Sequence, residues 1–212
     1  MKRILAISLL LAGSVFCAFA EWSKIVCAGV VVPFSSTTIT DWDEDFLDSE
    51  HKTSCGGGVD GQFRLVKDSG LALMFDADAA FVSRGESKGV GGTFLFGVGA
   101  EVVHSESWKL ILSGAAGING LSLAESDAFT VSGYDVDEDT DFLNLLIGAD
   151  LFFSKNVSSR LALFAQCTVG VGIGAVNREF TLDRNGHDET ESYAGVCRSF
   201  FCAPKIGVCW QF

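Results

Sequence analysis

The chain has 212 residues, of which 48% are hydrophobic and 20% are charged, and its mean hydropathy is +0.33. This composition excludes an intrinsically disordered chain, and the length fits a single domain, including a large all-β one. Acidic side chains outnumber basic ones by 27 to 15, for a net charge of -12. Nucleic acid is therefore excluded as a partner, because binding to phosphates requires clustered positive charge.

The N-terminus has the pattern of a secretory signal peptide. Lys2 and Arg3 precede an apolar run that ends with small residues at Ala20. A short positive region, an apolar stretch and small residues at the cleavage point are typical of such peptides. We expect residues 1–20 to be removed and residues 21–212 to form one domain.

Apolar side chains recur at every second residue through most of the remaining chain. Such alternation predicts strands with one apolar face. A further strand is expected from Trp22 to Val32, but the sequence does not fix which of its faces is apolar, because Ile25 and Val30 fit neither choice. No internal run reaches the roughly 18 apolar residues of a membrane-spanning helix. The alternating segments are 55–65, 71–81, 94–102, 108–118, 143–153, 161–173 and 200–212.

The connections between these segments alternate in length. Short turns are expected near 67–70, 104–107 and 154–159, and longer connections at 35–53, 83–89, 122–141 and 176–196. Short turns at one end and longer loops at the other are typical of outer-membrane barrels. We therefore predict an all-β fold, an eight-stranded antiparallel up-and-down transmembrane β-barrel with short periplasmic turns and long acidic extracellular loops.

A soluble, lipocalin-like ligand-binding barrel would show the same two-residue period with its apolar face inward. The membrane is favoured because the apolar face holds no charged or polar side chain, whereas the opposite face mixes isolated charges with many glycines. These charges would form a network in the lumen, either as a plug or along a narrow path for solutes. The predicted network consists of Asp60, Arg64, Asp76, Asp78, Glu101, Lys109, Asp150, Arg160 and Lys205.

The last strand carries a more specific signal. Ile206, Val208, Trp210 and Phe212 alternate up to a terminal aromatic residue, and Pro204 predicts a local bulge because it cannot donate to the ladder. Here the chain resembles the small outer-membrane β-barrel proteins of the OmpX, OmpA-barrel and OmpW type.

In those families such a strand is the recognition signal for the barrel-assembly machinery. The resemblance implies the bacterial outer membrane as the location, with outer-membrane lipid and the assembly machinery as partners. For the OmpW type it also implies a hydrophobic pocket that opens through the barrel wall for small apolar molecules.

The negative charge is concentrated in the external connections, which hold 19 acidic against five basic side chains. Such a surface attracts divalent cations and cationic ligands. Asp135, Asp137, Asp139 and Asp141 form the densest alternating set, but Thr140 and Leu146 stand where an EF-hand needs glycine and glutamate. A solvated acidic loop is favoured over a loose Ca²⁺ or Mg²⁺ site on these four residues, and no other cofactor is expected.

Six cysteines follow the signal peptide, without a CxxC pair. An exported protein permits disulfides, and a Cys55–Cys197 bridge is one candidate, whereas Cys167 and Cys202 would face lipid. His51 and His187 lie in external loops beside serines, but no catalytic motif accompanies them, so a lipid-modifying enzyme is not expected. The favoured function is a narrow, OmpW-like channel for small solutes; the alternative is a surface adhesin that binds an extracellular partner through the acidic loops.

Overall fold

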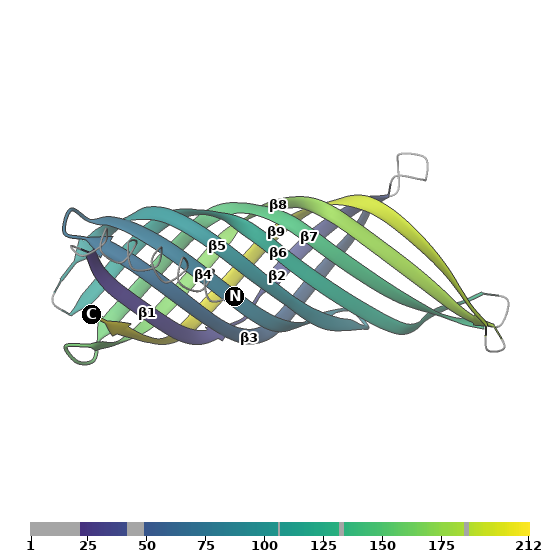
Figure 1. Cartoon of the computed structure of the whole chain (residues 1–212), viewed down its shortest axis with the longest axis horizontal. Coiled ribbons are helices and arrows are strands. Elements are labelled where there is room, and N and C mark those ends of the chain that lie inside the picture. Colours follow the sequence, from purple (N-terminus) through teal and green to yellow (C-terminus); the bar gives the residue numbers. More distant parts are fainter. Residues whose placement is uncertain (1–21, 42–48, 106, 132–133, 185–186) are drawn as a thin grey trace, which may run out of the picture.

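The computed structural model describes residues 22–41, 49–105, 107–131, 134–184 and 187–212, so the expected signal peptide lies outside the described residues. No helix in these ranges is long and apolar enough to cross a membrane. The described chain is almost entirely extended (Figure 1). Its strands are β1 (Trp22–Val31), β2 (Phe34–Asp41), β3 (Ser49–Lys67), β4 (Leu71–Arg84), β5 (Ser87–His104), β6 (Trp108–Val131), β7 (Tyr134–Asn156), β8 (Leu161–Arg184) and β9 (His187–Gln211).

Strands β1 and β2 act as one strand of the sheet. Both pair with β3 on one side and with β9 on the other, and all pairs are antiparallel. The register continues across the interruption without a slip, since Val31 opposes Lys205 and Phe34 opposes Cys202. The remaining strands pair in chain order from β3 to β9. The sheet is therefore a closed ring of eight strands, which confirms the predicted fold class.

The long external connections are built as extended hairpins. Strand β6 runs to Val131 and β7 begins at Tyr134, so most of the expected loop 122–141 is paired strand. Strands β8 and β9 likewise extend through most of the expected loop 176–196. Beyond the bilayer neither face needs to be apolar, so the two-residue pattern ends while the backbone ladder continues.

The expected connection at 83–89 is also shorter than predicted. Strands β4 and β5 remain paired to Arg84 and Ser87 and are joined by a tight turn in which Gly85 has φ +61°. Only glycine adopts such a conformation without a steric penalty, which explains its position here.

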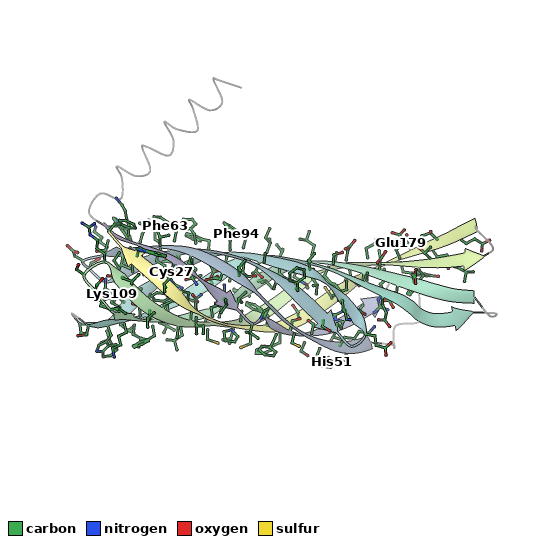
Figure 2. All side chains as sticks on the ribbon, turned by 90° about the horizontal axis from the view of Figure 1, so that it is seen from below. Cys27, His51, Phe63, Phe94, Lys109 and Glu179 are labelled. Atoms are coloured by element: carbon green, nitrogen blue, oxygen red, sulfur yellow. A yellow bond between two sulfur atoms is a disulfide. The ribbon has the colours of Figure 1, made fainter. Side chains whose placement is uncertain are left out.

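The apolar face predicted from the sequence points outward. Phe94, Leu145, Ile147 and Ile206 each keep half or more of their side-chain surface exposed, whereas Leu65 is a buried exception. Figure 2 shows side chains along the outside of the barrel wall, with Phe94 on this surface. A closed sheet with an apolar outer band has every ladder group paired in lipid, so this barrel is suited to span a membrane.

The structure also shows which residues of β1 face the lumen and which face outward. Ile25, Cys27 and Val31 point inward and are buried, whereas Val26 and Val30 point outward. Ile25 and Cys27 join an apolar cluster at the end that carries the short turns. Both faces of β1 are therefore apolar, which is why alternation did not reveal its orientation.

Deletion of Phe212 tests the predicted assembly signal. The ring is 75% exposed and the backbone exchanges two hydrogen bonds with Lys24, so the finished barrel loses little contact with this residue. We expect less protein inserted in cells and nearly normal refolding into detergent micelles, measured by heat-modifiable gel mobility. Failure to refold in vitro would make Phe212 a structural residue; unchanged insertion in cells would mean that the terminal strand carries no assembly signal.

Candidate functional site

The lumen contains a buried ion-pair network centred on Lys205 of β9. The Lys205 ammonium donates to three carboxylates: Asp60 at 2.8 Å, Asp76 at 2.6 Å and Asp78 at 3.1 Å. Asp60 comes from β3 and the other two from β4, all at inward-facing positions. The single ammonium thus holds together three acidic groups in a site closed to bulk water.

A second cation extends the network. Arg64 of β3 donates to Asp150 of β7 at 2.9 Å, and its guanidinium lies 4.1 Å from the ring centroid of Phe152. Gln166 of β8 donates to both Asp150 at 2.6 Å and Asp76 at 2.9 Å, which joins the two halves. Four carboxylates therefore face two cations in one connected network.

This network crosses the lumen. In the ring of eight strands, β3 and β7 lie opposite one another, as do β4 and β8, and both pairs are bridged by the bonds above. On the periplasmic side, Ile111, Phe152 and Phe164 belong to a fully apolar cluster that also holds Ile25 and Cys27 of β1. The two layers together close the lumen toward the periplasm.

Six of the nine predicted lumen charges belong to this network: Asp60, Arg64, Asp76, Asp78, Asp150 and Lys205. Glu101 and Lys109 also lie on inward-facing positions, but nearer the periplasmic turns, and Figure 2 places Lys109 at that end. The prediction for Arg160 is wrong, because this residue lies exposed in the turn before β8, which begins at Leu161.

Uncharged polar residues complete the network, and the sequence analysis missed them. Gln62 donates to Asp60 at 2.7 Å and accepts from Arg64, and Thr168 donates to Asp150 at 2.9 Å. Gln62, Gln166 and Thr168 all stand at inward-facing positions of the predicted strands. A search for any polar side chain on that face, instead of charges alone, would have identified them.

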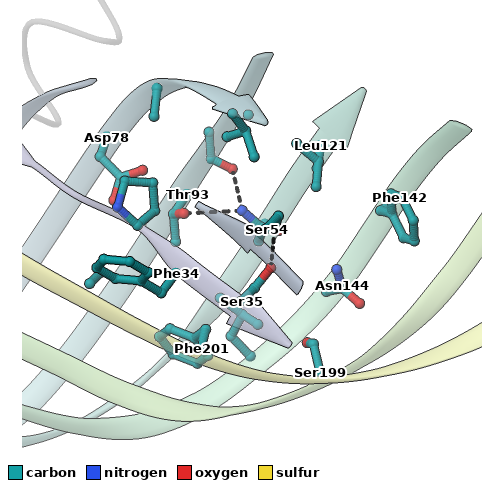
Figure 3. A pocket seen from close by; sticks show the side chains of 18 of the residues that line it. Phe34, Ser35, Ser54, Asp78, Thr93, Leu121, Phe142, Asn144, Ser199 and Phe201 are labelled. Atoms are coloured by element: carbon teal, nitrogen blue, oxygen red, sulfur yellow. Dashed lines mark hydrogen bonds between the residues drawn. The ribbon is translucent and has the colours of Figure 1, made fainter. Parts of the chain in front are cut away.

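A small cavity lies on the extracellular side of the network, and Asp78 and Lys205 are among its lining residues. It leaves ≈ 60 Å³ for water-sized molecules, which is more than the ~15 Å³ that one water molecule needs. Figure 3 shows Asp78 beside this cavity. Asn119 donates to the Thr93 hydroxyl and to the Gly92 carbonyl, each at 3.2 Å, along one wall. Apolar side chains form much of the rest, namely Ala80, Val82, Leu95, Leu121, Phe142, Leu146 and Phe201.

The cavity reaches the barrel wall. Most of its lining residues point inward, but Phe34 and Cys202 have outward-facing positions on adjacent strands and also line it. Pro33 and Ala203, which lie between them and the lumen, line it as well. The cavity is therefore bounded on this side by the seam between β2 and β9.

The two prolines remove ladder bonds on both sides of the segment between β1 and β2, one toward β9 and one toward β3. Val32 donates to the Pro204 carbonyl at 3.0 Å, and Gly56 donates to the Pro33 carbonyl at 3.0 Å. In each of these antiparallel pairs the reciprocal bond is missing, because proline has no N–H group. The only two prolines of the chain therefore lie side by side on neighbouring strands. No bulge forms at Pro204, contrary to the prediction, since the register runs through it unchanged.

The neighbouring strand adds little bulk to the same part of the wall. Gly56, Gly57 and Gly58 of β3 stand opposite the interruption between β1 and β2. Glycines contribute no side chain to either face of a sheet. One missing bond toward β9, one missing bond toward β3 and three glycines of β3 thus weaken the wall beside the cavity.

The cysteines are arranged differently from the prediction. Cys27 of β1 and Cys209 of β9 are directly opposed in register and form a disulfide buried inside the barrel. The predicted Cys55–Cys197 bridge is wrong, because the Cys55 side chain is exposed and that of Cys197 is buried. Cys167 and Cys202 are free, as expected, with their sulfurs 3.7 Å apart.

The predicted metal ligands do not converge. Asp137, Asp139 and Asp141 are exposed at alternate positions of β7, an extended strand in which such residues lie about 6.8 Å apart. The side chain of Asp135 lies outside the described residues. Asp137, Asp139 and Asp141 therefore form no preassembled site, and a loose Ca²⁺ or Mg²⁺ site on these residues stays a prediction. The broader expectation, that cations gather loosely around the acidic hairpins, stays a prediction.

His51 of β3 is hydrogen-bonded on the outer face of the barrel. Its ring nitrogens are hydrogen-bonded to Ser36 at 2.9 Å and to Thr38 at 3.3 Å. Among the described residues no carboxylate contacts the ring, so the arrangement lacks the acidic member that orients the histidine of a Ser–His–Asp triad.

No protein-family model matches this chain, and no curated protein matches its sequence. Solved structures similar to it are outer-membrane proteins. OprG from Pseudomonas aeruginosa is 11% identical, with a TM-score of 0.48 over 91% of this chain and 96% of that one. The attachment invasion locus protein Ail of Yersinia pestis is also 11% identical, with a TM-score of 0.41 over 91% and 99%.

A major outer-membrane protein from Thermus thermophilus is 12% identical, with a TM-score of 0.46 over 87% of this chain and 99% of that one. At these identities the likeness concerns the fold alone. The fold itself is carried by this chain's own closed ring of eight antiparallel strands with an apolar outer face, the architecture of a small outer-membrane β-barrel.

Proposed function

We propose that this protein is an outer-membrane channel that passes small apolar solutes sideways through the barrel wall at Pro33. The observation that carries the proposal is the cavity lined both by inward-facing residues and by Phe34 and Cys202, which face outward. A path straight through the lumen is disfavoured because the ion-pair network and the apolar cluster close it toward the periplasm.

The chemistry of the cavity indicates the class of solute. Its apolar side chains, among them Leu95, Leu146 and Phe201, suit a hydrocarbon surface, while Thr93 and Asn119 offer hydrogen bonds to one polar group. The cavity is small, at ≈ 60 Å³ for water-sized molecules, so we expect a solute to displace lining side chains such as Phe34 and Phe201 as it enters. Small, mostly apolar molecules with at most one polar group fit this description.

Restoring the two missing ladder bonds should slow transport. Alanine at position 204 supplies the missing N–H group across the seam to Val32, and alanine at position 33 supplies the missing one toward Gly56 of β3. Each new hydrogen bond would stabilise this part of the wall by about 0.5–1.5 kcal/mol. We expect P33A/P204A to take up the apolar fluorophore N-phenylnaphthylamine several-fold more slowly than the unaltered protein, when cells with equal amounts of inserted barrel are compared.

The matched control is G114A, which adds a methyl group to the lipid-facing side of β6, across the ring from the seam. A Cβ there has only a backbone oxygen at 4.0 Å, so the wall accepts it without strain. Uptake through G114A should equal that of the unaltered protein. Equal uptake through P33A/P204A as well would contradict a route through this seam.

A second function is supported by the hairpins of β6–β7 and β8–β9. They continue as paired strands beyond the apolar band and present exposed acids, among them Asp139 and Glu179, and Figure 2 shows Glu179 toward that far end. Such a surface favours a cationic partner. Binding of a basic protein that is lost when the hairpin tips are neutralised, without change in uptake, would assign adhesion to these hairpins.

A further inference from the structure

A groove on the outside of the barrel differs in chemistry from the cavity. It measures ≈ 490 Å³ and lies over β7, β8, β9, β2 and β3. Outward-facing apolar side chains of β7, β8 and β9 form one part of it, and polar side chains of β9, β2 and β3 form the other. The apolar members are Leu145, Ile147, Val171, Ile173 and Phe200; the polar edge holds Ser36, Thr38, His51 and Arg198.

The strand register places the polar residues in a row. His51 opposes Thr38, and Thr38 opposes Arg198, so three adjacent strands present them at one level of the outer face. The same row continues into apolar residues, because Arg198 opposes Ile173 and Ile173 opposes Leu145. Figure 2 shows His51 on the side of the barrel toward the long hairpins. The row therefore lies at the extracellular margin of the apolar band.

Arg198 stands out in this setting. Its side chain is exposed on the outer face, and it forms no ion pair with any residue that the structure describes. The hairpins above it are strongly acidic. A cation at the edge of a lipid-facing surface, beneath a negatively charged crown, is a place where an anionic headgroup is attracted and held at a defined depth.

The hydroxyl groups beside Arg198 can add donors. A neutral imidazole has one N–H and one lone pair, so one of the two hydroxyls at His51 accepts from the ring and keeps its own proton. That proton is free to be donated to a ligand oxygen. Arg198 and such a hydroxyl together match a phosphate group, which accepts several hydrogen bonds and pairs well with guanidinium.

We propose that this groove binds a phosphorylated lipid of the outer leaflet. The phosphate contacts Arg198 and the Ser36–Thr38–His51 cluster, and the acyl chains lie along Val171, Ile173 and Phe200. The charge of Arg198 beside the apolar side chains of the groove suits an amphiphile with an anionic head, whereas a free phosphate ion would use only the polar half of the site. This site is independent of the route through the seam.

The test is native mass spectrometry of the full barrel released from detergent. Dioleoyl phosphatidic acid serves as the probe. Dioleoylglycerol, which has the same acyl chains but no phosphate, serves as the control lipid. We expect one phosphatidic acid to be retained with clear preference over dioleoylglycerol, and R198Q to weaken this retention about tenfold, as fits the loss of a charge-assisted bond. Excess inorganic phosphate should not displace the lipid.

The control variant is K88Q, which removes an exposed, outward-facing lysine from β5 on another part of the wall. It should retain the lipid as the unaltered protein does. An R198Q protein that is folded by gel mobility and binds like K88Q would overturn the proposal. So would equal retention of dioleoylglycerol, or displacement of the lipid by inorganic phosphate alone.

Discussion

Replacement of Lys205 by methionine should lower the free energy of unfolding by about 3–5 kcal/mol, the cost of removing one partner from a buried ion pair. The ammonium is the cation shared by Asp60, Asp76 and Asp78, so its loss leaves three carboxylates facing one another without it. Urea unfolding in detergent micelles, followed by tryptophan fluorescence, measures the change.

The exposed Lys155 of β7 provides the matched control, since K155M should change the unfolding free energy by less than about 0.5 kcal/mol. Removing one of the uncompensated charges should recover part of the loss, so K205M/D76N is expected to be more stable than K205M. A loss below about 1 kcal/mol for K205M would mean that the network fills the lumen without stabilising it.

Loss of the Cys27–Cys209 disulfide should cost about 2–5 kcal/mol, because the bond closes a loop of nearly the whole barrel. It joins the first strand to the last, two segments 182 residues apart in sequence. We expect C27S/C209S to convert to the slow-migrating, unfolded gel form at a clearly lower temperature. The pair C167S/C202S, which removes two free thiols from neighbouring strands, should leave that temperature nearly unchanged.

The disulfide also limits where the seam between the first and last strands can open. It clamps β1 to β9, whereas the ladder bond missing between these two strands lies further along, at Val32 and Pro204. An opening at the prolines can therefore form without separating the periplasmic halves of the two strands. If C27S/C209S unfolded at the same temperature as the unaltered protein, the disulfide would not contribute to the stability of the closed ring.

The strand pattern could be predicted because bilayer and lumen impose opposite demands on alternate residues. This rule holds only where the two faces differ. It did not orient β1, whose inward residues Ile25 and Val31 are apolar as well, and it ended where β6 and β7 leave the bilayer while remaining paired. Without the orientation of β1, the sequence could not give the register of the last strand against the first. The Cys27–Cys209 bridge, which depends on that register, was therefore not predicted.

The candidate site was only partly visible in the sequence. The buried charges could be predicted from their alternate positions along the strands, but their partners could not. Arg64 contacts Asp150 across the lumen, and an alternating pattern does not say which side chains meet there. The weak seam depends on Pro33 and Pro204 being neighbours. They are 171 residues apart in the chain, and only the closed ring brings them together.

The central claim is that the seam between β2 and β9 opens. Phe34 opposes Cys202 in register, so F34C can form a disulfide with this native thiol and lock the seam. Cys55 and Cys167, the other thiols within reach, are replaced by serine in the same protein. Uptake of N-phenylnaphthylamine is then compared before and after reduction, with the unaltered protein treated alike. The account predicts at least about tenfold slower uptake while the lock is oxidised and recovery on reduction; uptake equally fast with the seam locked would contradict it.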